Sequence, residues 1–459
     1  MRRPNPILAL MALLAFAASS LPSSFDLPAA ARERQIKWST KNIQIALSTS
    51  LSSPSPAIKP DSDVIGAVHR ALASWSRVAN IKFVEVSSKR QSVSPATKGD
   101  GVSLITIAAT DDNVGLFTKG DTTARTRVFY DPETGEINEA DIVINPYPYS
   151  VSGAALQFSS DGTPGTYDLE STLAHEIGHL LGLSHSHVIG ATMQASQTLN
   201  GTYGLPAISE RTLSDPDQEA VRSLYGPREK TGTGGAIEGR ILRSIDGSLL
   251  PVAAAHVWIE DLDSGKVMAS RLTNAIGKFS IGNIPPGNYR AMVEYLDPSV
   301  NADALTAAGD RQSAGQERAF RSVEIRSSLR VNAAEATALN YVLVSTQNLA
   351  PEVVPRFIGL NGELSTVPVP VSAGEKIKLY VSGAGVDQIP GNGLVFSSPF
   401  MTIDPASLTL EQFGKSDPVI SFVVTISAKA LPGDFTLKLQ SNTGEVAYLV
   451  GSLTINPAN

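Results

Sequence analysis

The sequence predicts an α+β domain over residues 36–227, followed by two all-β sandwich domains over residues 236–345 and 351–459. Three observations predict this order. The first part of the chain mixes helical and strand periodicity, whereas the rest consists of short alternating strands separated by glycine and proline turns. Residues 226–235 have the glycine-rich composition of a flexible linker. A length of 459 residues also exceeds what one hydrophobic core accommodates, so about three domains are expected.

Helices and strands alternate in the first domain. Asp61 or Asp63 can cap a helix that extends to about Val78, with its apolar residues on one stripe. Asp168 is placed to cap a second helix. The expected strands are 42–47, 81–86, 102–108, 127–130 and 137–144, the last two forming a hairpin.

Every element expected beyond residue 236 is a strand. An alanine-rich polar segment, residues 301–315, interrupts the second domain and is expected to be helical or mobile. The clearest strand patterns are 237–241, 257–259, 277–281 and 320–344 in the second domain, and 371–381, 422–426 and 432–439 in the third.

Composition excludes several classes of protein. The net charge is −7 with both signs scattered along the chain, so no basic footprint indicates nucleic acid or an anionic membrane. Cysteine is absent, so the β-domains depend on their own cores without disulfides, and no propeptide thiolate can occupy a metal.

The N-terminal segment has the pattern of a signal peptide. Arg2 and Arg3 precede an apolar run, residues 7–18, that is followed by small residues. The run is short for a bilayer span, so we expect cleavage, after Ala17 or Ala31, rather than anchoring. We therefore interpret residues 1–31 as a signal peptide of a secreted protein, extracellular, periplasmic or on the cell surface, with no membrane span after cleavage.

The most informative residues are His175, Glu176, His179, Gly182 and His185, in the pattern H-E-x-x-H-x-x-G-x-x-H. Histidines four apart on a helix project from one face and can share a zinc ion. Gly182 can take a positive φ, end the helix and return the chain, so that His185 becomes the third ligand. Three imidazoles leave the fourth position of Zn²⁺ open for water, and Glu176 is placed as its general base. The pattern predicts hydrolysis through a zinc-activated water.

Several segments resemble the matrixin branch of the metzincin zinc peptidases, in the manner of bacterial members. Besides the zinc pattern, the resemblance is carried by Trp38, 71–76, Phe83, 135–144, Ser186, 189–193, 213–217 and 224–226. It implies a metzincin catalytic domain with a twisted five-stranded sheet and three helices, in which Met193 lies beneath the zinc. It further implies a metalloendopeptidase acting on protein or peptide substrates, with the substrate added as a strand to the edge near residues 123–129.

The sequence departs from the family pattern near the expected specificity pocket. Gln194 and Ala195 stand where the family has Tyr and Pro, and residues 198–210 lengthen the pocket loop. Animal matrixins hold a second, structural zinc with histidines that have no counterparts here. The one histidine upstream of His175 is His69. We interpret His187 as a polar loop residue, with contact to substrate or water as the alternative.

Calcium is a further possible cofactor, with a structural role. The aspartates that could provide oxygen ligands from loops are Asp111, Asp112, Asp121 and Asp131. Such acids often only solvate a turn, so both interpretations stay open.

The second domain resembles the carboxypeptidase regulatory-like sandwich, through residues 277–289 with their P-P-G-x-Y turn, and the third resembles an Ig-like module. Neither carries a catalytic constellation, and they could bind a cell-surface or matrix component, present the enzyme or act as spacers. The alternative to an active endopeptidase is a non-proteolytic, zinc-containing adhesive or scaffold protein of the cell surface. An intact Glu176 favours the enzyme.

Overall fold

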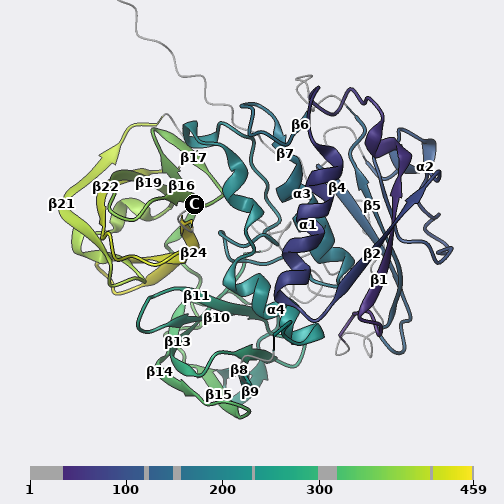
Figure 1. Cartoon of the computed structure of the whole chain (residues 1–459). Coiled ribbons are helices and arrows are strands. Elements are labelled where there is room, and N and C mark those ends of the chain that lie inside the picture. The colour runs from purple at the N-terminus through teal and green to yellow at the C-terminus, as the bar shows by residue number, and fades with distance from the viewer. Residues whose placement is uncertain are drawn as a thin grey trace, which may run out of the picture.

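A computed structural model describes residues 35–117, 123–147, 157–229, 233–297, 318–413 and 417–456. The expected signal peptide and the insertion at 301–315 lie outside the described residues. The expected fold class is confirmed: a five-stranded sheet with helices is followed by two β-sandwiches. In Figure 1 the first domain lies on one side, the C-terminal sandwich on the other, and the middle sandwich below both. The domain bounds given above stay predictions.

The first domain is built on a sheet with strand order β2-β1-β3-β5-β4. Only β4 is antiparallel to its neighbour, and it forms one edge. The described elements are β1 (Asn42–Ser48), η2 (Thr49–Ser52), α1 (Val64–Val78), β2 (Lys82–Ser88), β3 (Leu104–Thr106), α2 (Asp111–Val114), β4 (Ala124–Tyr130), β5 (Ile137–Ile144), β6 (Phe158–Ser159), β7 (Tyr167–Asp168), α3 (Leu169–Leu180), η3 (Thr202–Gly204), η4 (Ala207–Arg211) and α4 (Asp215–Tyr225).

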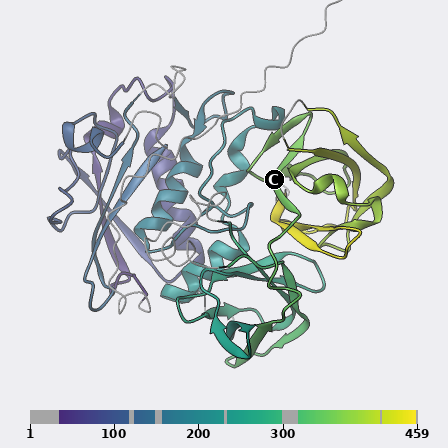
Figure 2. The same ribbon diagram turned by 180° about the vertical axis from the view of Figure 1, so that it is seen from behind.

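Helices α1 and α3 pack against each other beside this sheet (Figure 2). Asp63 caps α1 by accepting a hydrogen bond from the Gly66 N–H at 2.9 Å, so of the two expected caps it is Asp63 that serves. The apolar stripe of α1 is buried, and the indole N–H of Trp75 donates to the Ala174 carbonyl of α3 at 2.9 Å. This bond fixes α3, which carries the predicted zinc ligands, against α1.

The middle sandwich has two sheets, with strand orders β11-β10-β13-β14 and β12-β8-β15, and β9 pairs with β8. Its core contains alternate residues of these strands, among them Ile237, Val257, Ile281 and Leu339. The strands are β8 (Gly235–Ile245), β9 (Ser248–Pro251), β10 (His256–Asp261), β11 (Val267–Leu272), β12 (Lys278–Ile284), β13 (Gly287–Glu294), β14 (Val323–Val331) and β15 (Ala336–Leu343).

The C-terminal sandwich pairs a five-stranded sheet, β17-β16-β19-β22-β21, with a four-stranded one, β18-β24-β23-β20. The single strand expected at 371–381 is wrong: a turn centred on Gly374, with φ +90°, divides it, and its two parts join different sheets. The elements are β16 (Val354–Leu360), β17 (Glu363–Ser365), β18 (Val369–Val371), β19 (Lys376–Ala384), η5 (Val386–Gln388), η6 (Gly391–Gly393), β20 (Leu394–Phe396), β21 (Met401–Glu411), β22 (Val419–Ile426), β23 (Gly433–Gln440) and β24 (Val446–Ile455).

The sandwiches make direct contacts with the first domain and are not connected to it by a flexible linker alone. Helix α4 lies against β11 and β12, where Glu219 pairs with Arg271 at 2.8 Å. Tyr203, which is only 2% exposed, inserts into the C-terminal sandwich, and its hydroxyl lies 3.0 Å from the Ile358 and Val367 carbonyls. The flexible-linker composition of 226–235 therefore does not make the domains independent.

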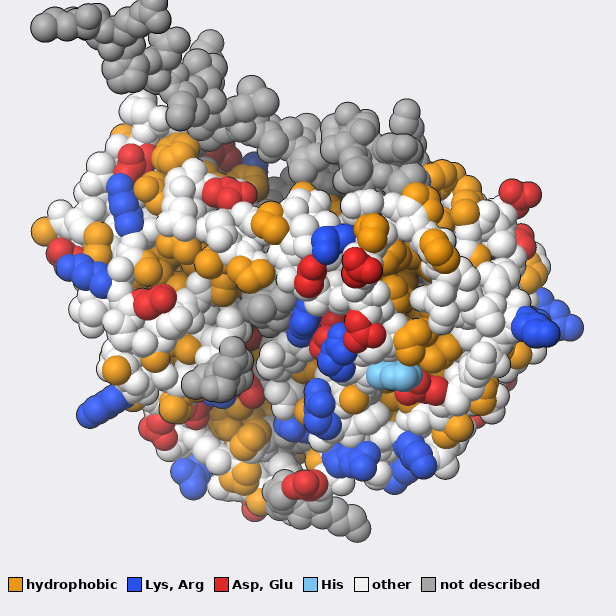
Figure 3. Space-filling model, turned by 45° about the horizontal axis from the view of Figure 1, so that its top comes forward, with side chains coloured by type: hydrophobic (Ala, Val, Ile, Leu, Met, Phe, Trp, Pro, Cys, Tyr) orange, Lys and Arg blue, Asp and Glu red, His pale blue; other side chains and the backbone are white. Residues whose placement is uncertain are grey.

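The described surface mixes charges of both signs. On the face shown in Figure 3, Lys and Arg side chains lie among Asp and Glu side chains, with hydrophobic side chains between them. Among the described residues, no helix is both long and apolar enough to cross a membrane.

Candidate metal centre

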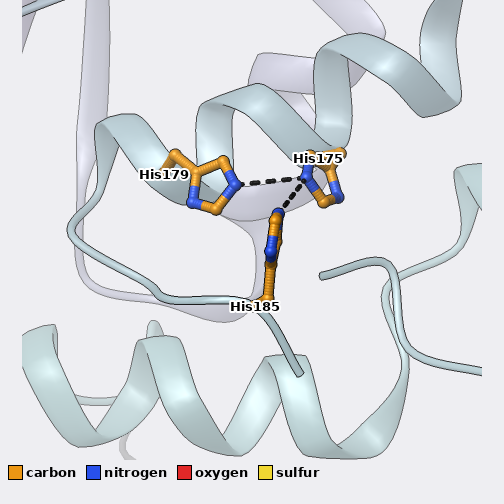
Figure 4. A group of neighbouring side chains, drawn as sticks. All are labelled: His175, His179 and His185. Atoms are coloured by element: carbon orange, nitrogen blue, oxygen red, sulfur yellow. Dashed lines mark hydrogen bonds between the residues drawn. The ribbon is translucent and has the colours of Figure 1, made fainter. Parts of the chain in front are cut away.

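The predicted zinc ligands meet at one point between α3 and the loop that follows it (Figure 4). Asp168 caps α3 as expected, accepting from the Ser171 N–H at 2.9 Å. The helix ends at Leu180, and Gly182 adopts φ +91°. Its ideal Cβ would lie 2.1 Å from the Ile36 carbonyl oxygen, so glycine is required both by conformation and by space. The turn brings His185 back onto the histidines of α3.

The Nε2 atoms have the spacing of a shared metal ligand set. His175 Nε2 lies 3.1 Å from that of His179 and 3.2 Å from that of His185. Ligand atoms about 2.0–2.1 Å from a tetrahedral zinc ion lie about 3.3 Å apart. The residues present therefore fit zinc, and the ligand assignment itself stays a prediction.

Backbone carbonyls hold two of the imidazoles from behind. His175 Nδ1 donates to the Thr192 carbonyl and His179 Nδ1 to the Leu183 carbonyl, both at 2.8 Å. These bonds fix the tautomer with Nε2 free to bind a metal. Burial lowers the pKa of both His175 and His179 to about 4, which keeps the rings neutral, as zinc ligands are.

Glu176 lies beside the histidines, buried between α3 and the edge strand β4. Its Oε2 accepts a hydrogen bond from the Thr126 hydroxyl at 2.5 Å. Burial raises the pKa of Glu176, while the neighbouring His179 and the Thr126 hydrogen bond lower it. Thr126 was not recognised in the sequence because its role depends on β4 passing over α3. The expected substrate edge, residues 123–129, falls on this strand.

The Met-turn, residues 189–193, packs against α3 and is supported by α4. Met193 is 1% exposed, and its sulfur would lie 2.2 Å from a Cβ at Gly178. The Asp217 carboxylate accepts from the Thr192 and Met193 N–H groups, at 2.6 and 3.4 Å. Helix α4 therefore orients the Thr192 carbonyl, which accepts the hydrogen bond from His175 Nδ1.

The C-terminal sandwich contributes to the hollow beside the Met-turn. This hollow is lined by Thr192, Gln197 and Glu210 from the first domain and by Pro368 from the sandwich. Gln194, expected to alter a pocket wall, also lines this hollow, and its side-chain amide donates to the Thr366 carbonyl at 2.7 Å. Burial, with the nearby Asp168 charge, raises the pKa of Glu210 to about 8.

His187 lies in a loop, as expected from the sequence, but its side chain contacts another domain. It faces the middle sandwich, where its ring lies 4.8 Å from that of His256 and its Nε2 lies 3.7 Å from Glu294 Oε1. Of the proposed calcium ligands, Asp131 accepts from two N–H groups of its own turn, at 2.7 and 2.9 Å. Asp111 and Asp112 begin α2, and Asp121 lies outside the described residues.

Comparisons with known proteins agree with the zinc-binding part of the chain. The family model described as Matrixin matches residues 110–226. Metalloendoproteinase 1 of Glycine max is 27% identical over 197 residues, covering 41% of this chain and 53% of that protein. The interstitial collagenase of Equus caballus is 30% identical over 174 residues, covering 37% and 30%. Karilysin of Tannerella forsythia is 28% identical over 166 residues, covering 35% and 28%.

The chain thus spans about half of the first of these relatives and less than a third of the other two. The residues matched by the family model, 110–226, lie within the first domain. Over 49% of this chain, the major pilin subunit of Bacillus cereus is similar with 10% identity. Its TM-score of 0.17 is too low to carry an argument about fold or function.

Proposed function

We propose that the protein is a secreted zinc-dependent endopeptidase that hydrolyses peptide bonds, with Glu176 as general base. The observation that carries the proposal is the convergence of three imidazoles, with His175 Nε2 3.1 Å from His179 Nε2 and 3.2 Å from His185 Nε2, and a buried carboxylate of α3 beside them. A bound zinc ion would supply Lewis acidity, which polarises a carbonyl group and lowers the pKa of a water molecule toward ~7.

The residues of this chain would then hold the substrate and move the proton. The edge strand β4 offers backbone groups to an extended peptide, which would place one carbonyl over the histidines. Glu176 takes the proton of the attacking water and delivers it to the leaving amine. The raised pKa of Glu176 suits both proton transfers, and the Thr126 hydroxyl holds the carboxylate in place from the first transfer to the second.

Substrate selection would depend on the sandwiches as well as on the first domain. The hollow beside the Met-turn includes Pro368, so the residue after the scissile bond would contact both domains. Secretion is proposed from the basic and apolar N-terminal segment alone. Binding of a cell-surface or matrix component by the sandwiches stays a proposal without a defined site.

Cleavage of denatured casein by the protein and by Glu176→Gln tests the proposal. We expect the variant to lose about 10²–10⁴-fold in kcat, because the amide cannot accept the proton, while it keeps its zinc. Glu133→Gln, at an exposed position of the β4–β5 turn, is the matched control and should cleave normally. Chelation should abolish cleavage and added zinc restore it.

Two results would contradict the proposal. Undiminished cleavage by Glu176→Gln would remove that residue from the mechanism. A wild-type protein that binds zinc at these histidines but cleaves no denatured protein would favour the adhesive or scaffold alternative.

A further inference from the structure

A second group of metal-ligating side chains lies where the first domain meets the middle sandwich. His187, His256 and Glu294 each offer one ligand atom, and these atoms all lie within 4.8 Å of one another. His256 and Glu294 face each other on β10 and β13, where they form a cross-strand pair. His187 comes from the loop between the third predicted zinc ligand, His185, and the Met-turn. The group therefore joins two domains.

We propose that His187, His256 and Glu294 bind a zinc ion that fastens the loop from His185 to the Met-turn to the middle sandwich. The set of two imidazoles and one carboxylate is one that zinc uses, with a fourth position left for water. Imidazole ligands also disfavour calcium and magnesium, which prefer oxygen.

Of the two distances from Glu294 to the histidines, one is shorter and the other longer than the spacing of ligand atoms in a zinc site. Glu294 Oε1 is 2.9 Å from His256 Nδ1 and 3.7 Å from His187 Nε2. Ligand atoms around a tetrahedral zinc ion lie about 3.3 Å apart, so small side-chain rotations would equalise them. The His187 side chain, 19% exposed, offers an entry path, whereas that of His256 is 1% exposed.

The charge balance of the cluster also favours a cation. Two other buried carboxylates of the same interface region are paired with guanidinium groups: Glu219 with Arg271 at 2.8 Å, and Glu260 with Arg290 at 2.6 Å. Among the described residues, the ion-pair partners of Glu294 are the two histidines. A buried carboxylate is costly unless a positive charge or a proton balances it.

The histidine partners provide no such charge in their neutral form. A neutral imidazole is the form that binds metal, and a divalent ion would balance Glu294 without protonating either ring. The competing state is a metal-free cluster in which Glu294 itself holds a proton.

Zinc counting by elemental analysis on the full chain tests the proposal without any measurement of proteolysis. After dialysis to remove loosely bound metal, we expect two zinc ions per wild-type chain. The isosteric variant Glu294→Gln should retain one, and so should His179→Ala, which removes the other centre. His69→Gln, at an exposed histidine paired with Glu85, controls for adventitious surface zinc and should retain two.

One zinc per wild-type chain, unchanged in Glu294→Gln and absent in His179→Ala, would overturn the proposal and leave a metal-free hydrogen-bonded cluster. If Glu294→Gln fails to fold, calorimetric titration of the His179→Ala chain with zinc decides instead. Binding of one equivalent supports the site, and no binding refutes it. Because neither readout uses cleavage, a failure of the proposal for this second zinc site is distinguishable from a failure of the proposed peptidase activity.

Discussion

Gly178, between His175 and His179 of α3, offers a sharp test of how the Met-turn supports the predicted metal centre. An alanine Cβ there would lie 2.2 Å from the Met193 sulfur and 3.0 Å from Trp75 Cζ2. Trp75 is fully buried and its indole is hydrogen-bonded to α3, so Met193 is the side chain that must move, by about 1.5 Å to reach ordinary contact. The adjacent Thr192 carbonyl, which holds His175, moves with it.

Gly178→Ala should therefore weaken zinc binding more than it weakens the fold. Overpacking costs about 1–3 kcal/mol, but alanine regains about 1 kcal/mol of helix propensity. The net loss of about 0–2 kcal/mol corresponds to a fall in Tm of about 0–8 °C. Disturbing a partner of a metal-bound histidine typically costs about 10–100-fold in metal affinity, and we expect a loss in that range. Competition with a chromophoric chelator measures it.

A double-mutant cycle with Met193→Ala decides whether this reasoning is correct. The smaller side chain leaves room for the new methyl group, so the double variant should bind zinc more tightly than additivity predicts. Additive effects on zinc affinity would refute the steric argument. Unchanged affinity in Gly178→Ala alone would show that the Met-turn does not position His175.

Two further predictions concern the contacts between domains. A chain truncated after Gly226 exposes Tyr203 and leaves Glu219 without its arginine, so its first domain should unfold at a lower temperature, by about 3–12 °C for the tyrosine alone. Equal calorimetric transitions of the first domain in the truncated and the full-length protein would contradict this. Burial raises the pKa of Asp434 to about 8, while an unfolded aspartate titrates near 3.8. The folded state thus holds a proton on Asp434 that the unfolded state loses, so the contribution of Asp434 to stability falls as pH rises from about 4 to 8, by at most about 1.4 kcal/mol per pH unit. Asp434→Asn, which can still accept a hydrogen bond from the Thr454 hydroxyl, should lose this contribution. Parallel pH profiles of Tm for the wild type and the variant would contradict the prediction.

Local signals predicted the elements that build the zinc centre. The caps Asp63 and Asp168 act within one helical turn, so their sequence context was sufficient. The spacing of the histidines and Gly182 encodes the geometry of a helix followed by a reversal, and the structure has both. These features depend on residues near one another in the chain.

The features that the sequence did not reveal depend on contacts between distant segments. Thr126 reaches Glu176 only because the edge strand crosses α3, and Tyr203 is buried by a sandwich more than a hundred residues later. His187 looked like a loop residue because its partners, His256 and Glu294, belong to another domain. The glycine-rich composition of residues 226–235 described the backbone freedom of that segment and carried no information about the surfaces on either side of it.

The loop from His185 to Met193 is surrounded in part by strands that are synthesised much later than the loop itself. Its Ile189 N–H donates to the Val450 carbonyl at 2.8 Å, and Gly190 lies against Asp434, so strands β23 and β24 form part of its surroundings. These strands are synthesised long after the histidines. A nascent chain can therefore contain all its zinc ligands while the outer wall of their loop is still missing. We expect full rigidity of the predicted metal centre only after the C-terminal sandwich has folded, so the maturation of this centre would depend on an intact C-terminal sandwich.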